Sequence, residues 1–313
     1  MNCEILETLY VRSNGDIPCN DDAGEEVLLG RVDLDDPAWS IEQVLGGAPF
    51  AEIRNKLSAG EAPWSQCQRC AWLRPHEPTA DALAARKITK LQLEPSLRCN
   101  LKCPGCSNQA QSATRHRPHV MPISMYLCLL DSLRNQSYSV DQIEYCGQGE
   151  PLLHPKFSSF ISLARGHLPS AIQRVITNGN VDYAKATGRQ GMEEIFVSCD
   201  GLYQANYERY RVGGNVDRAI QFMRDVPKIE NGIRQHLIWK YILFEFNDSI
   251  AEIEAAQRLA QELGVDTMLF VGTHSTYRSE YWLNGRTHEF PILYPNVATS
   301  VTPVQQREIV SST

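Results

Sequence analysis

Three closely spaced cysteines constrain this chain more than any other feature of its sequence. Cys99, Cys103 and Cys106 form a Cys-x3-Cys-x2-Cys group just after a short apolar segment. Three thiolates on one short loop can hold three corners of an iron-sulfur cluster. Such a set leaves the fourth iron open, and an open metal position is what a catalytic site requires. The alternatives are a zinc loop with a distant fourth ligand, or free cysteines.

The rest of the composition narrows the class of protein. The chain has ten cysteines among 313 residues, and its first residues lack the basic and apolar regions of a signal peptide. We therefore expect a reducing, cytoplasmic location in which cysteines serve metal binding or catalysis rather than disulfides. No apolar run is long enough to span a bilayer, which predicts no membrane association. The net charge of -7 argues against general nucleic-acid binding.

After residue 88, short apolar segments alternate with longer stretches of helical periodicity. This alternation predicts a parallel α/β sheet that is curled into a partial TIM-like (β/α)6 barrel. Helices are expected at Ser124–Arg134, Asp217–Arg224 and Ile250–Leu263, the last ending at Gly264. The six expected strands are Thr89–Pro95, Gln142–Cys146, Ile172–Thr177, Glu194–Cys199, His236–Phe246 and Thr267–Gly272.

The ends of these strands carry motifs that resemble the radical S-adenosylmethionine (radical SAM) superfamily. Gly147-Gln148-Gly149-Glu150-Pro151 is similar to the family's glycine-glutamate-proline turn, and Ile176-Thr177-Asn178-Gly179 to its third-strand end. Ser198-Cys199-Asp200-Gly201, followed by Tyr210-Arg211, resembles its fourth strand and the next helix. Two positions depart from the family pattern. Gly105 stands where many members have an aromatic residue beside the adenine, and Gln148 interrupts the commoner glycine pair.

The resemblance implies a cofactor, a chemistry and an electron donor. S-adenosylmethionine (SAM) would bind the open iron of a [4Fe-4S] cluster, and its reductive cleavage would give a 5′-deoxyadenosyl radical that takes a hydrogen atom from substrate. Flavodoxin or ferredoxin would supply the electron. By the same likeness Glu150 receives the methionine amino group, and Ser198 and Arg211 hold its carboxylate. The full expected cofactor-binding set is Gly147, Gly149, Glu150, Pro151, Thr177, Asn178, Ser198, Asp200 and Arg211.

The first 75 residues hold a second set of cysteines, Cys3, Cys19, Cys67 and Cys70. Their spacing resembles the SPASM auxiliary-cluster module in its shortened "twitch" form, although relatives usually carry that module after the barrel. The resemblance implies a small α+β domain with a second [4Fe-4S] cluster, and a structural zinc site is the alternative. The predicted organisation is an auxiliary domain at 1–75, a linker at 76–88, the barrel at 89–290 and a poorly ordered polar tail at 291–313.

Polar residues near the expected strand ends are candidates for catalysis. Glu94 or Glu144 would accept a substrate proton. Cys146 is the best candidate to return a hydrogen atom, whereas Cys128 and Cys199 are expected to pack in the core. Polar residues at the strand ends of a barrel are often functional. On this basis the expected substrate contacts are Gln92, Tyr241, Glu245, Asn247 and His274.

Two reactions follow from these expectations. The first is two-electron oxidation of a small polar metabolite such as a sugar, an aminocyclitol or a nucleotide-linked alcohol. The auxiliary cluster would then accept the second electron. The alternative is a redox-neutral epimerase, or an enzyme that forms carbon-carbon or carbon-sulfur bonds, acting on a small molecule or a peptide. A non-catalytic, cysteine-rich metal-binding scaffold is a third reading, which predicts no cleavage of SAM.

Overall fold

A computed structural model describes residues 1–20, 27–70, 72–78, 80–106, 120–273, 277–293 and 297–300. Within these ranges the largest sheet has eight strands in the order β14-β13-β12-β9-β8-β7-β6-β2, and every neighbouring pair is parallel. Its strands are β2 (Thr8–Val11), β6 (Lys87–Leu93), β7 (Ser139–Tyr145), β8 (Ile172–Thr177), β9 (Glu194–Ser198), β12 (His236–Ile242), β13 (Thr267–Val271) and β14 (Val297–Ser300).

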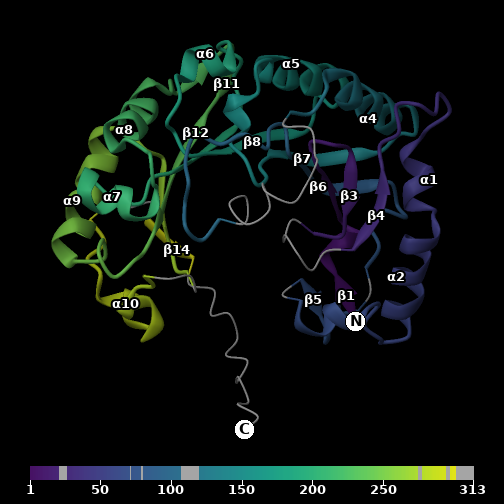
Figure 1. Cartoon of the computed structure of the whole chain (residues 1–313), viewed down its shortest axis with the longest axis horizontal. Coiled ribbons are helices and arrows are strands. Elements are labelled where there is room, and N and C mark those ends of the chain that lie inside the picture. The colour runs from purple at the N-terminus through teal and green to yellow at the C-terminus, as the bar shows by residue number, and fades with distance from the viewer. Residues whose placement is uncertain are drawn as a thin grey trace, which may run out of the picture.

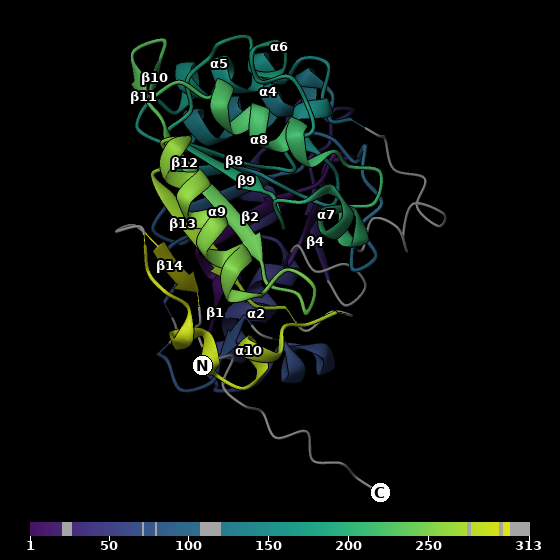
Figure 2. The ribbon, with the colours of Figure 1, turned by 90° about the vertical axis from the view of Figure 1, so that its left-hand side faces the viewer.

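Helices cover the convex side of this sheet, as Figure 1 shows, and Figure 2 shows α9 lying outside β12 and β13. The arrangement is the mixed α/β architecture of a partial barrel, as predicted. The longer helices contribute one buried apolar face each, for example Phe157, Phe160 and Ile161 of α5. The helices in this layer are α4 (Ile123–Asn135), α5 (Phe157–His167), α6 (Tyr183–Thr187), α7 (Gln204–Tyr210), α8 (Val216–Asp225), α9 (Ile250–Glu262) and α10 (Glu280–Leu283).

The six predicted barrel strands are present, and their boundaries differ by a few residues. The largest difference is in β12, which ends at Ile242 instead of Phe246. The side chain of Asn247 explains this early end, because its Nδ2 donates to the carbonyl of Ile242 and its Oδ1 accepts from the backbone N–H of Phe244. These bonds replace the ladder bonds that a longer strand would make. As expected, α9 is followed by Gly264, which adopts a left-handed conformation (φ 68°).

The N-terminal segment forms small elements around the end of the sheet. Strand β3 (Asp16–Pro18) pairs with β4 (Leu28–Arg31), and β1 (Asn2–Cys3) pairs with β5 (Leu73–Arg74). The helices are α1 (Ile41–Leu45) and α2 (Ala48–Ser58), with the short 3-10 helices η1 (Glu4–Leu6) and η2 (Ser65–Arg69). Three more small elements lie within the barrel region: the hairpin β10 (Ile229–Glu230) with β11 (Ile233–Arg234), and the 3-10 helices η3 (Pro151–Leu153) and η4 (Arg286–Glu289).

Two expectations about the ends of the chain need correction. The sequence predicts short strands at Leu9–Arg12 and Val27–Val32 around a turn at Ser13–Asp16, but these two strands do not pair with each other. The first of them is β2, which adds to the barrel sheet in parallel beside β6. The tail after Pro291 was expected to be poorly ordered. Within it, Val297–Ser300 forms β14, which pairs with β13. This pairing is possible because an edge strand has backbone N–H and C=O groups that can bond another strand. The division of the chain at residues 75 and 88 stays a prediction. The structure adds that β6 begins at Lys87 and that Leu83 lies buried in the same core as the barrel.

Candidate active site

The three clustered cysteines lie on the loop that follows β6, at the carboxyl edge of the sheet. Cys103 is buried, and the backbone N–H of Cys106 donates to its carbonyl oxygen at 3.0 Å. The sulfur of Cys99 accepts from the backbone N–H of Leu101 at 3.4 Å. The pKa of Cys99 is raised to about 11, mainly by burial, and nearby Glu150 and the other two cysteines contribute to this rise. Neutral thiols are therefore favoured until a metal or cluster binds them.

Two side chains from outside the cysteine loop donate hydrogen bonds toward these sulfurs. Asn178 follows β8 and places its Nδ2 3.8 Å from the Cys99 sulfur, and Arg211 follows α7 and places Nη1 3.9 Å from the Cys103 sulfur. Burial raises the pKa of Cys103, while the positive charge of Arg211 opposes that rise. A cation and an amide beside thiolates stabilise their negative charge. The donor set thus fits a cluster carried on Cys99, Cys103 and Cys106.

Glu150 ties the cluster loop to the neighbouring strand ends. One carboxylate oxygen accepts from the backbone N–H of Leu152 and from the Thr177 hydroxyl, and the other accepts from the backbone N–H of Asn178 at 2.8 Å. The carboxylate is buried, and burial raises its pKa while these three donors lower it. An ionised carboxylate has about four acceptor sites, so one remains for a further donor such as an ammonium group.

The glycines before Glu150 are required by close packing. A Cβ at Gly149 would overlap the carbonyl oxygen of Ser96 and the backbone of Leu97, which lead into the cysteine loop. A Cβ at Gly147 would lie 2.6 Å from the side chain of Glu94. Pro151 then occupies the first turn of η3, where its missing N–H costs nothing.

Asp200 and Arg211 form a buried ion pair beside the cysteine loop. Oδ2 of Asp200 lies 2.6 Å from Nε of Arg211, and Oδ1 accepts from the backbone N–H of Ile242 at 2.7 Å. Asp200 is fully buried and the Arg211 side chain is 12% exposed. Asp200 was expected to bind the cofactor, but its contacts show that it holds the guanidinium in place. Ser198, at the end of β9, is also buried.

The four N-terminal cysteines meet in one pocket, although they are spread over 68 residues of sequence. Cys3, Cys19, Cys67 and Cys70 line it together with Trp64, Trp72 and other mainly apolar side chains, and its volume is about 370 Å³ including space open to solvent. Burial raises the pKa of Cys3 to about 12, and the three other cysteines add to that rise. All ten cysteines of the chain are described and all are free thiols. Four thiols facing one cavity fit a cluster with four cysteine ligands. No three Cys, His, Asp or Glu side chains of the described residues are arranged to hold a single metal ion.

Comparisons with known proteins agree with this site. The chain is 29% identical over 119 residues to a protein of Methanocella arvoryzae named Probable GTP 3′,8-cyclase, and 27% identical over 134 residues to one of the same name from Methanococcus maripaludis. These matches span 37% and 42% of this chain but only 36% and 43% of the relatives. A search against models of protein families finds no match.

The fold matches a solved structure over most of the chain. Streptococcus suis SuiB bound to S-adenosylmethionine superposes with a TM-score of 0.52 over 95% of this chain and 72% of SuiB, at 15% identity. This likeness, the cysteine triplet and the loops around Glu150 and Arg211 point to one family. The chain is similar to the radical SAM superfamily. Radical SAM neighbours imply SAM and a [4Fe-4S] cluster, and Cys99, Cys103 and Cys106 are the residues that would hold the cluster here.

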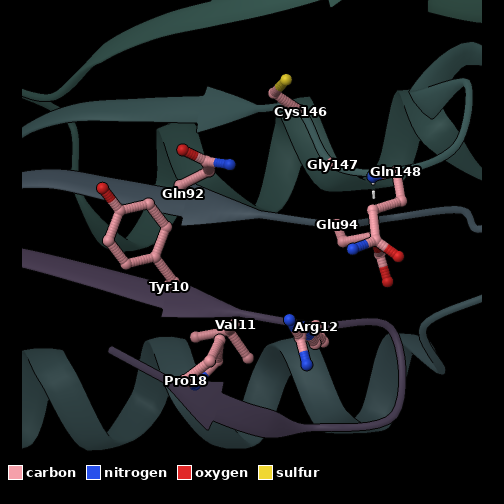
Figure 3. Close-up of a pocket in the computed structure, with 9 residues that line it drawn as sticks. All are labelled: Tyr10, Val11, Arg12, Pro18, Gln92, Glu94, Cys146, Gly147 and Gln148. Carbon is pink, nitrogen blue, oxygen red and sulfur yellow. Dashed lines mark hydrogen bonds between the residues drawn. The ribbon is translucent and has the colours of Figure 1, made fainter. Parts of the chain in front are cut away.

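A pocket beside this radical SAM site is built from three adjacent strands. Figure 3 shows Tyr10 and Arg12 coming from β2 and its end, Gln92 and Glu94 from β6 and its end, and Cys146 from the end of β7. Its volume is about 270 Å³ including open space, and Val11, Pro18, Gly147 and Gln148 complete the lining. Gln92, Glu94 and Cys146 were predicted from the sequence. Tyr10 and Arg12 were missed, because nothing in the sequence showed that β2 pairs with β6.

Glu94 is held firmly in this pocket. Oε1 accepts from the backbone N–H and the hydroxyl of Ser13, at 3.2 and 3.0 Å, and Oε2 accepts from the backbone N–H of Gln148 at 3.0 Å. Glu144 lies one layer deeper in the barrel and is paired with Arg174 at 3.2 Å, which Glu194 also contacts. Of the two predicted proton acceptors, only Glu94 lines the pocket.

The predicted substrate face on β12 needs correction. Tyr241 is fully buried on the helix-covered side, where its hydroxyl donates to the carbonyl of Asn247 and lies 3.4 Å from Glu252. Asn247 is fully buried by its bonds to Asp200, Ile242 and Phe244. Glu245 is exposed and lies 4.0 Å from Arg209. The sequence shows the alternation along β12 but not which of its two faces packs against the helices, and the face with Leu237, Trp239 and Tyr241 is the one buried there. His274 lies outside the described residues.

The remaining cysteines pack as expected. Cys199 is fully buried in the core with its thiol toward the carbonyl of Gly201, and Cys128 packs against the core from α4.

No helix in the described part of the chain is long and apolar enough to cross a membrane.

Proposed function

We propose that this radical SAM enzyme carries out the two-electron oxidation of a small polar metabolite, such as a sugar, an aminocyclitol or a nucleotide-linked alcohol. The observation that supports it best is the single pocket shared by Cys3, Cys19, Cys67 and Cys70. Four thiolates would fill every iron of a [4Fe-4S] cluster, so that cluster suits electron transfer rather than substrate binding. When bound, the two clusters and SAM would supply the hydrogen-abstracting radical and a one-electron acceptor.

The residues of the chain would position the substrate and receive its proton. Glu94 lines the 270 Å³ pocket with one oxygen bonded to Ser13 and the other to the backbone of Gln148. A substrate hydroxyl bound in this pocket would transfer its proton to the Glu94 carboxylate. Gln92 and Tyr10 face the same pocket and would orient the substrate. A flavodoxin or ferredoxin would deliver the first electron.

The second candidate is a redox-neutral reaction, and two observations favour it. Cys146 lines the same pocket as Glu94, so a thiol is available to return a hydrogen atom to a substrate radical. The curated relatives are named cyclases, which form bonds, although they match less than half of their own length. Cys146→Ala separates the candidates. An epimerase would lose its product and accumulate quenched radicals, whereas a dehydrogenase would be little affected.

Metal content tests the proposal most directly. The enzyme would be reconstituted without oxygen, and iron and zinc would be counted per chain. We expect about eight irons in the wild type and about four in the Cys99/Cys103/Cys106→Ala variant. The matched Cys3/Cys19/Cys67/Cys70→Ala variant should also keep about four irons and still cleave SAM. Four irons with one zinc in the wild type would make the N-terminal site structural and would leave the redox-neutral candidate.

A further inference from the structure

Strand β12 presents a lysine to the inside of the barrel. Leu237, Trp239 and Tyr241 are buried against the helices, and side chains alternate along a strand. Lys240 therefore lies on the inner face, where it is partly buried. Its direct neighbours in the sheet are Ser198 on β9 and Leu269 on β13.

Three other cations of the inner face and rim have carboxylate partners. Lys90 lies 3.1 Å from Glu4, Arg174 contacts Glu144 and Glu194, and Arg211 is paired with Asp200. The structure gives the ammonium group of Lys240 no hydrogen bond or ion pair within the described residues. A partly buried ammonium group without a counter-ion loses hydration that nothing replaces.

An apolar layer separates Lys240 from the acidic residues deeper in the barrel. Ile176, Phe196 and Ile238 are neighbours in register on β8, β9 and β12, one layer below Lys240. Arg174 covers the Phe196 ring from the deeper side, with its guanidinium carbon 4.7 Å from the ring centroid. Glu144 and Glu194 are thus engaged by Arg174 below this layer, and Lys240 lies above the layer, apart from both carboxylates.

We propose that Lys240 binds an oxyanion of the substrate, a phosphate or a carboxylate. The inference deepens the proposed function, since it names the substrate as an anion. Strand β12 is separated from β6 by β7, β8 and β9. The anionic group would therefore bind at the wall opposite Glu94, and the oxidised carbon would lie near Glu94. A lysine suits this role because its ammonium group is a compact charge with three donors.

The experiment follows the lysine side chains directly by NMR. The chain has only eight lysines, so reductive methylation with ¹³C-formaldehyde, which keeps the charge, gives a spectrum in which each can be resolved. The reconstituted enzyme with oxidised clusters would be used, and the Lys240→Arg variant would assign the Lys240 signal. Inorganic phosphate and acetate would be titrated in separate series at constant ionic strength, with chloride as the balancing ion.

We expect the Lys240 signal to shift and saturate at millimolar concentrations of phosphate or acetate. The exposed Lys56, which is paired with Glu61, serves as the control and should show no saturable shift. The Lys240 response should persist at saturating SAM. If the Lys240 signal, like that of Lys56, showed no saturable shift with either anion, the proposal would be wrong. Loss of the response when SAM binds would also overturn it, because Lys240 would then serve the SAM carboxylate. Neither result depends on iron content or turnover, so failure here is distinct from failure of the proposed oxidation.

Discussion

The buried pair of Asp200 and Arg211 gives the sharpest test of how the site is organised. Asp200→Asn keeps the size of the side chain and its bond from the backbone N–H of Ile242, but it removes the charge that faces Nε of Arg211 at 2.6 Å. Removing one partner of a buried ion pair costs about 3–5 kcal/mol. Because the bond from Ile242 is retained and Arg211 is partly exposed, we expect the loss of folding free energy to lie at the lower end of this range, at about 3 kcal/mol.

Two measurements separate loss of stability from loss of cofactor binding. We expect the variant to unfold about 5–10 °C below the wild type in a thermal scan. We also expect it to bind SAM about tenfold more weakly by equilibrium binding to the reconstituted enzyme, which corresponds to about 1.4 kcal/mol. The weaker binding follows if Arg211 receives the SAM carboxylate, since the guanidinium would no longer be fixed beside Cys103.

Asp182→Asn is the matched control. Asp182 is exposed and caps α6 by accepting from the backbone N–H of Lys185 at 2.7 Å. Asparagine caps helices about as well as aspartate, so neither stability nor SAM binding should change measurably. If Asp200→Asn behaved like this control in both measurements, Asp200 would not position Arg211 and the reasoning would be wrong.

Three further predictions concern the strand ends around the cysteine loop. Glu150→Gln should reduce the formation of 5′-deoxyadenosine from SAM by about 100-fold or more, because the amide loses the charge and its NH2 end must face either the N–H of Asn178 or the donors of Leu152 and Thr177. Activity within tenfold of the wild type would contradict this. Gly149→Ala should lower the iron content by about four irons per chain, because its Cβ would displace the backbone before Cys99. The control Gly166→Ala should leave the iron content unchanged, because Gly166 has open space around it. Burial lowers the pKa of His154, so the unfolded chain takes up its proton first and stability falls as pH drops below about 6.5. His154→Gln should flatten the fall in melting temperature between pH 7.5 and 5, and an unchanged pH profile would refute this role.

The barrel, and the meeting of the strand ends beside the cysteine loop, could be predicted from the sequence because both depend on local order. Each strand end carries its functional residue within a few positions of an apolar run, as Glu150 follows β7 and Asp200 follows β9. Parallel strands bring their carboxyl ends to one edge, so residues that are far apart in sequence meet without any further information. Cys99, Glu150, Asn178 and Arg211 are brought together in this way.

The errors arose where side chains, rather than strand order, decide the structure. Asn247 ends β12 through its own hydrogen bonds, so Glu245 and Asn247 lie beyond the strand on which they were placed, and the hydroxyl of Tyr241 bonds to the carbonyl of Asn247 on the helix-covered side. Arg174 neutralises Glu144, a proposed proton acceptor, through a pairing between strands that single-sequence reasoning did not provide. Lys240 was passed over for the same reason, because its significance depends on which cations elsewhere are already paired.

The N-terminal position of the four-cysteine segment has a physical explanation in the sheet. A partial barrel ends in exposed edge strands, whose free backbone groups accept another strand from any part of the chain. Here β2 pairs with β6 at one edge and β14 with β13 at the other. Only the short η1 separates Cys3 from β2, and β2 ends at the pocket that holds Glu94, so the pairing of β2 with β6 attaches the segment with Cys3 beside that pocket. Attachment at a sheet edge does not depend on whether the segment precedes or follows the barrel, so the unusual order along the chain is compatible with an auxiliary cluster that serves the same active site.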